Sequence, residues 1–189
     1  MIVPTFPPAA NAPGLPLAGR GRRFAALTYE TLLLTAIIFI AGFVALPLVT
    51  PGRAGTANAL AIPDLPQRVA LFCMLFGVLA WYSVASWSRG RRTLSMKTWR
   101  LQLAMADGGP VSRQTALLRF LATWIGPVLA IVVYALLRPA GLGAQAVWLI
   151  AFNFLWAFVD PQRQFLHDRI AGTRIVRAPP ATVAARAPA

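Results

Sequence analysis

Glu30 is the acidic residue with the most unusual setting in this sequence, because it lies inside a long apolar run that begins just after Arg23. An ionised side chain at mid-membrane costs about 2.5–3.5 kcal/mol, so this carboxylate indicates a buried ion pair, cation or proton exchange, or a side chain that only snorkels to the inner interface. Arg23 lies seven residues earlier on the same helical face, but about 10 Å shallower, and both side chains lean toward the helix N-terminus. We therefore expect Glu30 to find a partner from another segment, with Arg119 and Arg169 as the leading candidates.

A second group of candidate residues, Asp160, His167, Asp168 and Arg169, follows the last apolar run. Asp160 is expected at a helix C-terminus, where its charge opposes the helix dipole and needs a nearby cation. The other three are consecutive, so on a helix they point about 100° apart and cannot form a triad among themselves. His167 and Asp168 could assist proton transfer, since histidine titrates near neutrality, but a hydrogen-bonding anchor is the favoured interpretation.

The inventory of reactive residues excludes most classes of enzyme and cofactor. The chain has one cysteine, Cys73, and one histidine, which is too few for a disulfide framework or a zinc site built from these residue types. It contains no G-x-S-x-G, P-loop or G-x-G-x-x-G motif, and no nucleophile stands at a recognisable spacing from His167 and Asp168. We therefore expect no enzyme activity, no cofactor and no metal.

The composition indicates an integral membrane protein. Of the 189 residues, 58% are hydrophobic and 12% are charged, and the mean hydropathy is +0.63, whereas about a quarter of the residues of a soluble domain are charged. Four apolar segments predict an all-α integral membrane fold, a four-transmembrane-helix bundle, although the last segment is shorter than the roughly 20 residues that a span needs. The predicted spans are 24–49, 69–87, 120–137 and 144–159.

The basic residues favour a membrane protein over a nucleic-acid binder. The formal charge is +13, which by itself would suggest nucleic acid or an anionic membrane surface. With four spans and the N-terminus inside, 15 of the 18 Lys and Arg residues fall on the cytoplasmic side, as the positive-inside rule requires. This distribution accounts for the charge without nucleic acid, and it predicts that both termini are cytoplasmic. It also supports the fourth span, because without it the last five basic residues would move outside.

The polar segment between the second and third spans predicts structure at the inner membrane surface. Residues 91–100 mix basic and apolar side chains, which suits a short helix lying on the membrane. The alternation over 101–105 and a second short segment at 173–177 predict two strands that pair as a small cytoplasmic two-stranded ribbon. The Pro-rich residues 1–19 and the Ala/Pro-rich residues 178–189 predict disordered tails around a transmembrane domain at 20–177.

Four stretches together resemble the RDD family of bacterial polytopic membrane proteins. They are Arg23-Phe-Ala-Ala-Leu-Thr-Tyr-Glu30, the basic loop from Gly90 to Gly109, Leu117-Leu-Arg-Phe120, and Leu166-His-Asp-Arg-Ile-Ala-Gly-Thr173. The family is named for an arginine at the start of its first helix, an aspartate within that helix and a second aspartate. By position Arg23 matches the arginine, Glu30 stands where the first aspartate is expected, and either Asp160 or Asp168 matches the second. The resemblance implies a multi-pass protein of the bacterial inner (plasma) membrane.

Two functions of different classes follow from these features. The resemblance implies transport of a monovalent cation or a proton, since cation/proton antiport has been proposed for some family members, with Glu30 as the exchanging carboxylate. The alternative is a non-catalytic membrane scaffold or accessory subunit that binds anionic lipid or a partner protein at the cytoplasmic face. A transporter with so few polar groups would need a homo-oligomer or a membrane partner. The candidate ion or ion-pair cluster comprises Arg23, Glu30, Arg119, Asp160, His167, Asp168 and Arg169.

Overall fold

The structure, a computed structural model, describes residues 16–50 and 63–178. These residues are mostly helical, as the sequence predicts, and their two strands form one small sheet. The elements follow the chain in this order, with η for 3-10 helices: α1 (Arg20–Val49), α2 (Leu65–Trp87), α3 (Leu94–Thr98), β1 (Leu101–Met105), α4 (Arg113–Thr123), α5 (Ile125–Leu137), η2 (Arg138–Ala140), η3 (Gly143–Ala151), α6 (Phe152–Val159), α7 (Leu166–Ile170) and β2 (Thr173–Arg177).

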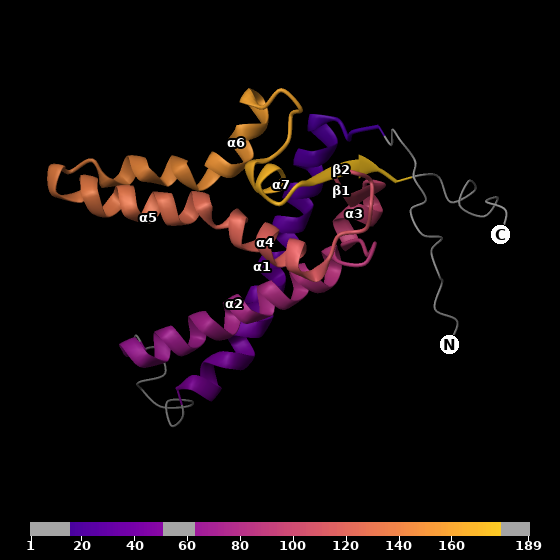
Figure 1. The fold of residues 1–189 in the computed structure, drawn as a ribbon. Coiled ribbons are helices and arrows are strands. Elements are labelled where there is room, and N and C mark those ends of the chain that lie inside the picture. Colours follow the sequence, from indigo (N-terminus) through magenta and orange to yellow (C-terminus); the bar gives the residue numbers. More distant parts are fainter. Residues whose placement is uncertain (1–15, 51–62, 179–189) are drawn as a thin grey trace.

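The first two helices, α1 and α2, form a hairpin (Figure 1). The apolar helix α1 carries three threonines, Thr28, Thr31 and Thr35, and each donates its hydroxyl to the carbonyl four residues earlier. These bonds satisfy the hydroxyls within the helix itself, as a lipid environment requires. At the start of α2, Asp64 and Gln67 form a capping box in which each side chain accepts from the other residue's backbone amide.

The second hairpin pairs α5 with η3 (Figure 1). The helical segment that contains α4 and α5 is interrupted at Trp124, because Pro127 has no amide to donate to the carbonyl of Thr123. The two arms of the hairpin come very close at Gly126, where an added Cβ would lie 2.7 Å from the carbonyl oxygen of Ile150. Only glycine permits this approach of one backbone to another.

The strands β1 and β2 pair antiparallel, with Leu103 opposite Ile175 at the centre of the register. The predicted two-stranded ribbon is therefore confirmed. The chain just before α1 extends this sheet, because Leu17 forms a bridge with Val176 and the amide of Ala18 donates to the carbonyl of Ile175 over 3.1 Å. The predicted tails at 1–19 and 178–189 lie mostly outside the described residues.

Between α2 and β1 the short helix α3 forms within the segment 91–100, where the sequence predicts one. Thr93 caps it by accepting from the amide of Met96 over 3.3 Å. Ser95 and Met96 are buried, and α3 packs against the first part of α1. This contact gives α1 a polar neighbour near its N-terminal end.

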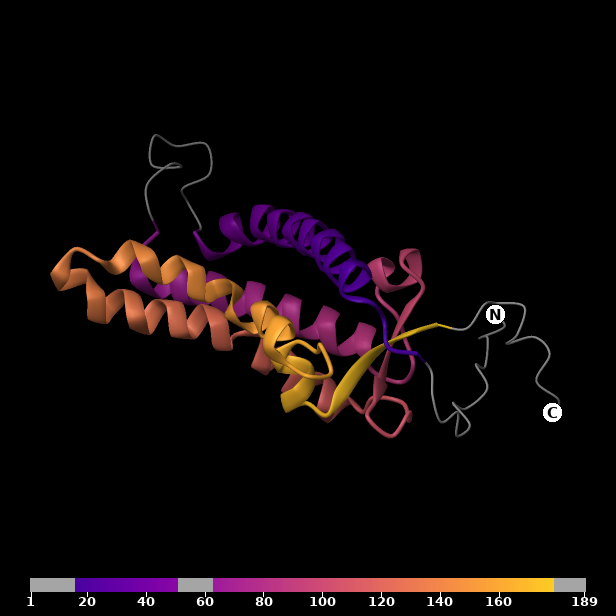
Figure 2. The ribbon, with the colours of Figure 1, turned by 90° about the horizontal axis from the view of Figure 1, so that it is seen from above.

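The two hairpins meet at one end of the protein, which carries α3, α7 and the sheet (Figure 1) and which we call the polar end. Seen from above, their tips point away from the sheet, from α3 and from the described ends of the chain (Figure 2). Three helical segments, Arg20–Val49, Leu65–Trp87 and Arg113–Ala140, are long and apolar enough to cross a membrane, and a shorter apolar segment covers Gly143–Val159. Large apolar side chains such as Phe39, Phe43 and Leu136 are 75%, 77% and 72% exposed. Such surfaces suit contact with lipid rather than with water.

Candidate functional site

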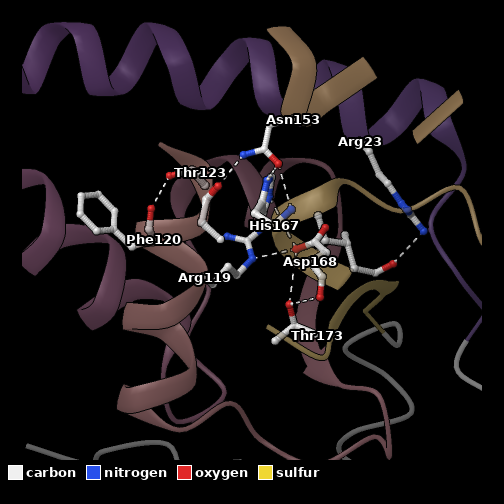
Figure 3. Close-up of polar contacts among 10 residues, drawn as sticks. Arg23, Arg119, Phe120, Thr123, Asn153, His167, Asp168 and Thr173 are labelled. Carbon is white, nitrogen blue, oxygen red and sulfur yellow. Dashed lines mark hydrogen bonds and ion pairs between the residues drawn. The ribbon is translucent and has the colours of Figure 1, made fainter. Parts of the chain in front are cut away.

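The polar end contains a buried ion pair between Arg119 of α4 and Asp168 of α7. Nε of Arg119 donates to Oδ1 of Asp168 over 2.8 Å, and the two side chains are 4% and 0% exposed (Figure 3). The guanidinium also lies over the ring of Trp87, 4.1 Å from its centroid, at the end of α2. A cation in this position gains from the electron density of the indole face. One arginine thus connects α2, α4 and α7.

His167 completes this network on the other side of the guanidinium. Nη2 of Arg119 lies 3.2 Å from Nε2 of His167, and Nδ1 of His167 lies 3.3 Å from Oδ1 of Asn153. Because a guanidinium only donates, Nε2 must accept, and the ring proton therefore sits on Nδ1 and points to Asn153. The imidazole is neutral in this arrangement. Burial, opposed by the charge of Asp168 and aided by that of Arg119, lowers its pKa from 6.5 to about 3.

Asp168 carries the negative charge of this network. Burial by itself would raise the pKa of its carboxyl, but the charge of Arg119 and its hydrogen bond hold that pKa below the usual value. The hydroxyl of Thr173, at the start of β2, lies 3.4 Å from Oδ1. The charged pair is thus Arg119 and Asp168, while the neutral His167 acts as the hydrogen-bonding anchor favoured by the sequence.

Asn153, on α6, belongs to the network but, like Thr173, is not among the site residues predicted from the sequence. It is fully buried, its Nδ2 donates to the carbonyl of Ala122 over 2.7 Å, and its Oδ1 accepts from the backbone amide of His167 over 2.9 Å. Ala122 lies in the last turn of α4, just before the interruption at Trp124. An amide in an otherwise apolar segment was the available signal. We use the name buried polar cluster for Arg119, Asn153, His167, Asp168 and Thr173.

A second ion pair joins Asp160 to Arg169 beside this cluster. Nε of Arg169 lies 3.3 Å from Oδ1 of Asp160, and the arginine is 47% exposed while the aspartate is buried. Oδ2 of Asp160 accepts from the backbone amide of Gln164 over 2.9 Å. Asp160 directly follows the last residue of α6, so the structure supplies the cation that the sequence predicts for this position.

Arg23 is buried but contacts backbone rather than a carboxylate among the described residues. Its Nη1 donates to the carbonyl of Arg163 over 2.6 Å, and its Nη2 lies 3.5 Å from the carbonyl of Ile175 (Figure 3). The side chain is 2% exposed. Arg23 therefore ties the start of α1 to the loop after α6 and to the strand β2, next to the buried polar cluster.

Glu30 lies apart from this cluster, on the side of α1 that faces α3. The hydroxyl of Ser95 donates to Oε2 of Glu30, and the hydroxyl of Thr93 lies 2.9 Å from that of Ser95. Oε1 is buried and makes no hydrogen bond within 3.5 Å to the described residues, and Tyr82 of α2 also lies near the carboxylate. The expectation that Arg119 or Arg169 pairs with Glu30 is wrong, because these arginines are paired with Asp168 and Asp160. The partner does come from another segment, but it is a neutral hydroxyl.

The described residues contain no group of three or more His, Cys, Asp or Glu side chains that could hold a metal ion.

The sequence-family model of the RDD family matches residues 17–172. The chain belongs to the RDD family. The match includes Arg23, Glu30, Asp160 and Asp168. No curated protein and no solved structure was found to match the chain. Family membership and the three long apolar helices together indicate a membrane protein.

Proposed function

We propose that this RDD protein crosses the bacterial inner membrane four times and keeps both termini in the cytoplasm. The fourth apolar segment, Gly143–Val159, supports this topology because its first part, η3, packs against α5 as the second arm of a hairpin. Four crossings would leave 15 of the 18 basic residues of the sequence on the cytoplasmic side, consistent with the positive-inside rule.

We propose that the protein acts there as a non-catalytic scaffold or accessory subunit. The observation that supports this role best is the closure of the buried polar cluster, in which Arg119, Asn153, His167 and Asp168 are each at most 4% exposed and bond to one another. His167 is neutral and titrates far below neutrality. Such a cluster fixes the relative positions of α4, α6 and α7, and offers no group that exchanges protons near neutral pH.

Thermal melting of the full chain in detergent tests the scaffold role. We expect Asp168→Asn to melt well below the wild type at every sodium concentration and at pH 7 and 8, and the wild type to melt at one temperature under all these conditions. Asp107→Asn is the matched control, because Asp107 is exposed in a turn and accepts from the amide of Gly109. A sodium-dependent rise of the wild-type melt would contradict a purely structural role, because ligands that bind the folded state stabilise it.

Cation or proton transport is the second candidate function, and the surroundings of Glu30 favour it. Its carboxylate has one buried oxygen that makes no hydrogen bond to the described residues and one that accepts from Ser95, with the hydroxyl of Thr93 adjacent. Oxygen ligands of this kind suit a hard monovalent cation, or a proton on the carboxylate itself. Exchange of one for the other would then occur near the cytoplasmic end of α1.

Flux measurements in everted vesicles test the transport role. Glu30→Gln keeps the size of the side chain and removes its charge, so transport through this carboxylate would be abolished. Asp107→Asn removes a carboxylate elsewhere at the same end of the protein and should leave the flux unchanged. Undiminished sodium-driven or potassium-driven proton movement in Glu30→Gln excludes the role of Glu30, and absence of any flux in the wild type favours the scaffold.

A further inference from the structure

A groove with an apolar wall and a basic rim lies between α2 and α4, and its volume is about 550 Å³. Trp81, Val84 and Leu117 contribute to the wall, and the indole of Trp81 is 74% exposed. The rim carries three exposed arginines, Arg89, Arg91 and Arg113. The groove therefore presents concentrated positive charge directly beside a surface suited to hydrocarbon.

Within the described part of the chain, no carboxylate neutralises these three arginines. None of their side chains makes a hydrogen bond or an ion pair among the described residues. The chain has only five acidic residues, and the structure assigns each of them a different environment. Glu30 accepts from Ser95, Asp64 caps α2, Asp107 accepts from Gly109, Asp160 pairs with Arg169, and Asp168 pairs with Arg119. The charge of the groove is thus left for an external anion.

The turn that carries two of the rim arginines has a left-handed backbone at Arg89, which is unfavourable for a residue other than glycine. Arg89 has a φ of +58° and is followed by Gly90 at +72°, a left-handed pair that disfavours any residue with a Cβ. The amide of Arg89 donates to the carbonyl of Val111 over 2.9 Å, and that of Arg91 to the carbonyl of Ser88 over 3.2 Å. The turn places Arg89 and Arg91 in the lining of the groove, although glycine would be the less strained residue at position 89.

We propose that this groove binds one anionic phospholipid, with the phosphate between Arg89, Arg91 and Arg113 and an acyl chain along Trp81, Val84 and Leu117. A lipid matches both parts of the groove, whereas free phosphate would use only the rim. This inference rests on the proposed placement of the sheet end at the cytoplasmic face, where the leaflet carries anionic lipids. The arginines complement the negative headgroup, and the apolar wall continues the exposed apolar surface of the helices.

Lipid titration of the full chain in an uncharged detergent, followed by native mass spectrometry, tests this site. We expect one dioleoyl-phosphatidylglycerol to be retained in preference to dioleoyl-phosphatidylcholine. Arg89→Gly should weaken the apparent affinity by about fivefold, which corresponds to the ~1 kcal/mol that a basic residue contributes near an anionic surface. Because this substitution also relieves the left-handed backbone, the variant should melt no lower than the wild type.

Arg100→Gly is the matched control, since Arg100 is also exposed and has a φ of +52° but does not line the groove. Equal losses of affinity in Arg89→Gly and Arg100→Gly would overturn the proposal in favour of diffuse attraction. Equal retention of the two lipids would overturn it as well. So would displacement of the bound phosphatidylglycerol by millimolar inorganic phosphate as effectively as by added phosphatidylglycerol. In detergent, lipid binding does not depend on how the protein is oriented in a membrane. A negative result in this titration is therefore distinct from a failure of the proposed topology.

Discussion

Arg119 and Asp168 meet across 49 residues of sequence, with Nε of the arginine donating to Oδ1 of the aspartate over 2.8 Å in a site closed to solvent. The pair joins two different helical segments, because Arg119 lies in α4 and Asp168 in α7. A buried ion pair stabilises a fold only while both partners are present. Substitution of either partner should therefore change the stability of the protein in a specific way.

Removing one member of this pair should be more harmful than removing both. We expect Asp168→Leu to lower the free energy of unfolding by about 3–5 kcal/mol, because it leaves a buried cation without its counter-charge. The double variant Arg119→Met/Asp168→Leu should recover most of that loss, since apolar residues of similar volume often replace a buried pair without cost. Unfolding in detergent measures both. Arg177→Met, at an exposed position of β2, should stay within about 0.5 kcal/mol of the wild type.

The neutral His167 predicts a loss of stability in mild acid. Above pH 6.5 the imidazole of His167 is neutral in both the folded and the unfolded state. Below pH 6.5 the unfolded chain binds a proton on this ring, whereas the folded chain binds it only near pH 3. Stability should therefore fall by up to ~1.4 kcal/mol per pH unit between pH 6.5 and 4.5. Asp168 adds its own loss only below its unfolded pKa of 3.8. The melting temperature of His167→Gln should depend less on pH over this window than that of the wild type. An equal dependence on pH in the two proteins would contradict the assignment.

Asn153 should matter far more than the other amide of its segment. Asn153→Leu removes one hydrogen bond from the carbonyl of Ala122 and leaves the amide and ring N–H of His167 without their partner, and we expect a loss of about 2–4 kcal/mol. Gln145→Leu is the matched control, because Gln145 is exposed and its replacement suits a lipid-facing surface. Unfolding experiments in detergent compare the two variants, and equal stability would show that the hydrogen bonds of Asn153 contribute nothing.

Replacing glycine by alanine should lower stability at Gly126, where α5 and η3 come close, and raise it at Gly77, where there is space for a Cβ. Gly126→Ala places a Cβ 2.7 Å from a backbone oxygen of Ile150, so the hairpin must open and we expect a loss of about 1–3 kcal/mol. Gly77→Ala, within α2, meets nothing within 4 Å and should gain about 0.5–1 kcal/mol from helix propensity. Melting temperatures that move in the same direction would contradict the packing of the second hairpin.

The sequence predicts those features that depend on local pattern. The alternation at 101–105 and at 173–177 predicts both strands, and the charge of Asp160 at a helix end predicts a cation, which proves to be Arg169. The resemblance to the RDD family, carried by short motifs, is confirmed by the family match. Each of these predictions uses residues that are close in sequence, or a signal that does not need the partner to be identified.

The partners of the buried charges could not be predicted, because the folded chain chooses them over long separations. Ser95 is an unremarkable serine in sequence and becomes the partner of Glu30 only because α3 packs on α1. Arg119 prefers Asp168 to Glu30 because α4 packs on α7. Asn153 is marked in the sequence by its amide deep in an apolar segment, because burying such a group is costly unless it is hydrogen-bonded.

Labelling of single cysteines in intact cells tests most directly whether the chain crosses the membrane four times with its polar end inside. In a Cys73→Ser background, cysteines replace Arg91, Arg138 and Arg174 one at a time, and a membrane-impermeant maleimide is added from outside. We predict that position 138, at the tip of the second hairpin, is labelled, while 91 and 174 are labelled only after the membrane is opened. Labelling of 91 and 174 from opposite sides would contradict the topology and the common cytoplasmic location of the buried polar cluster.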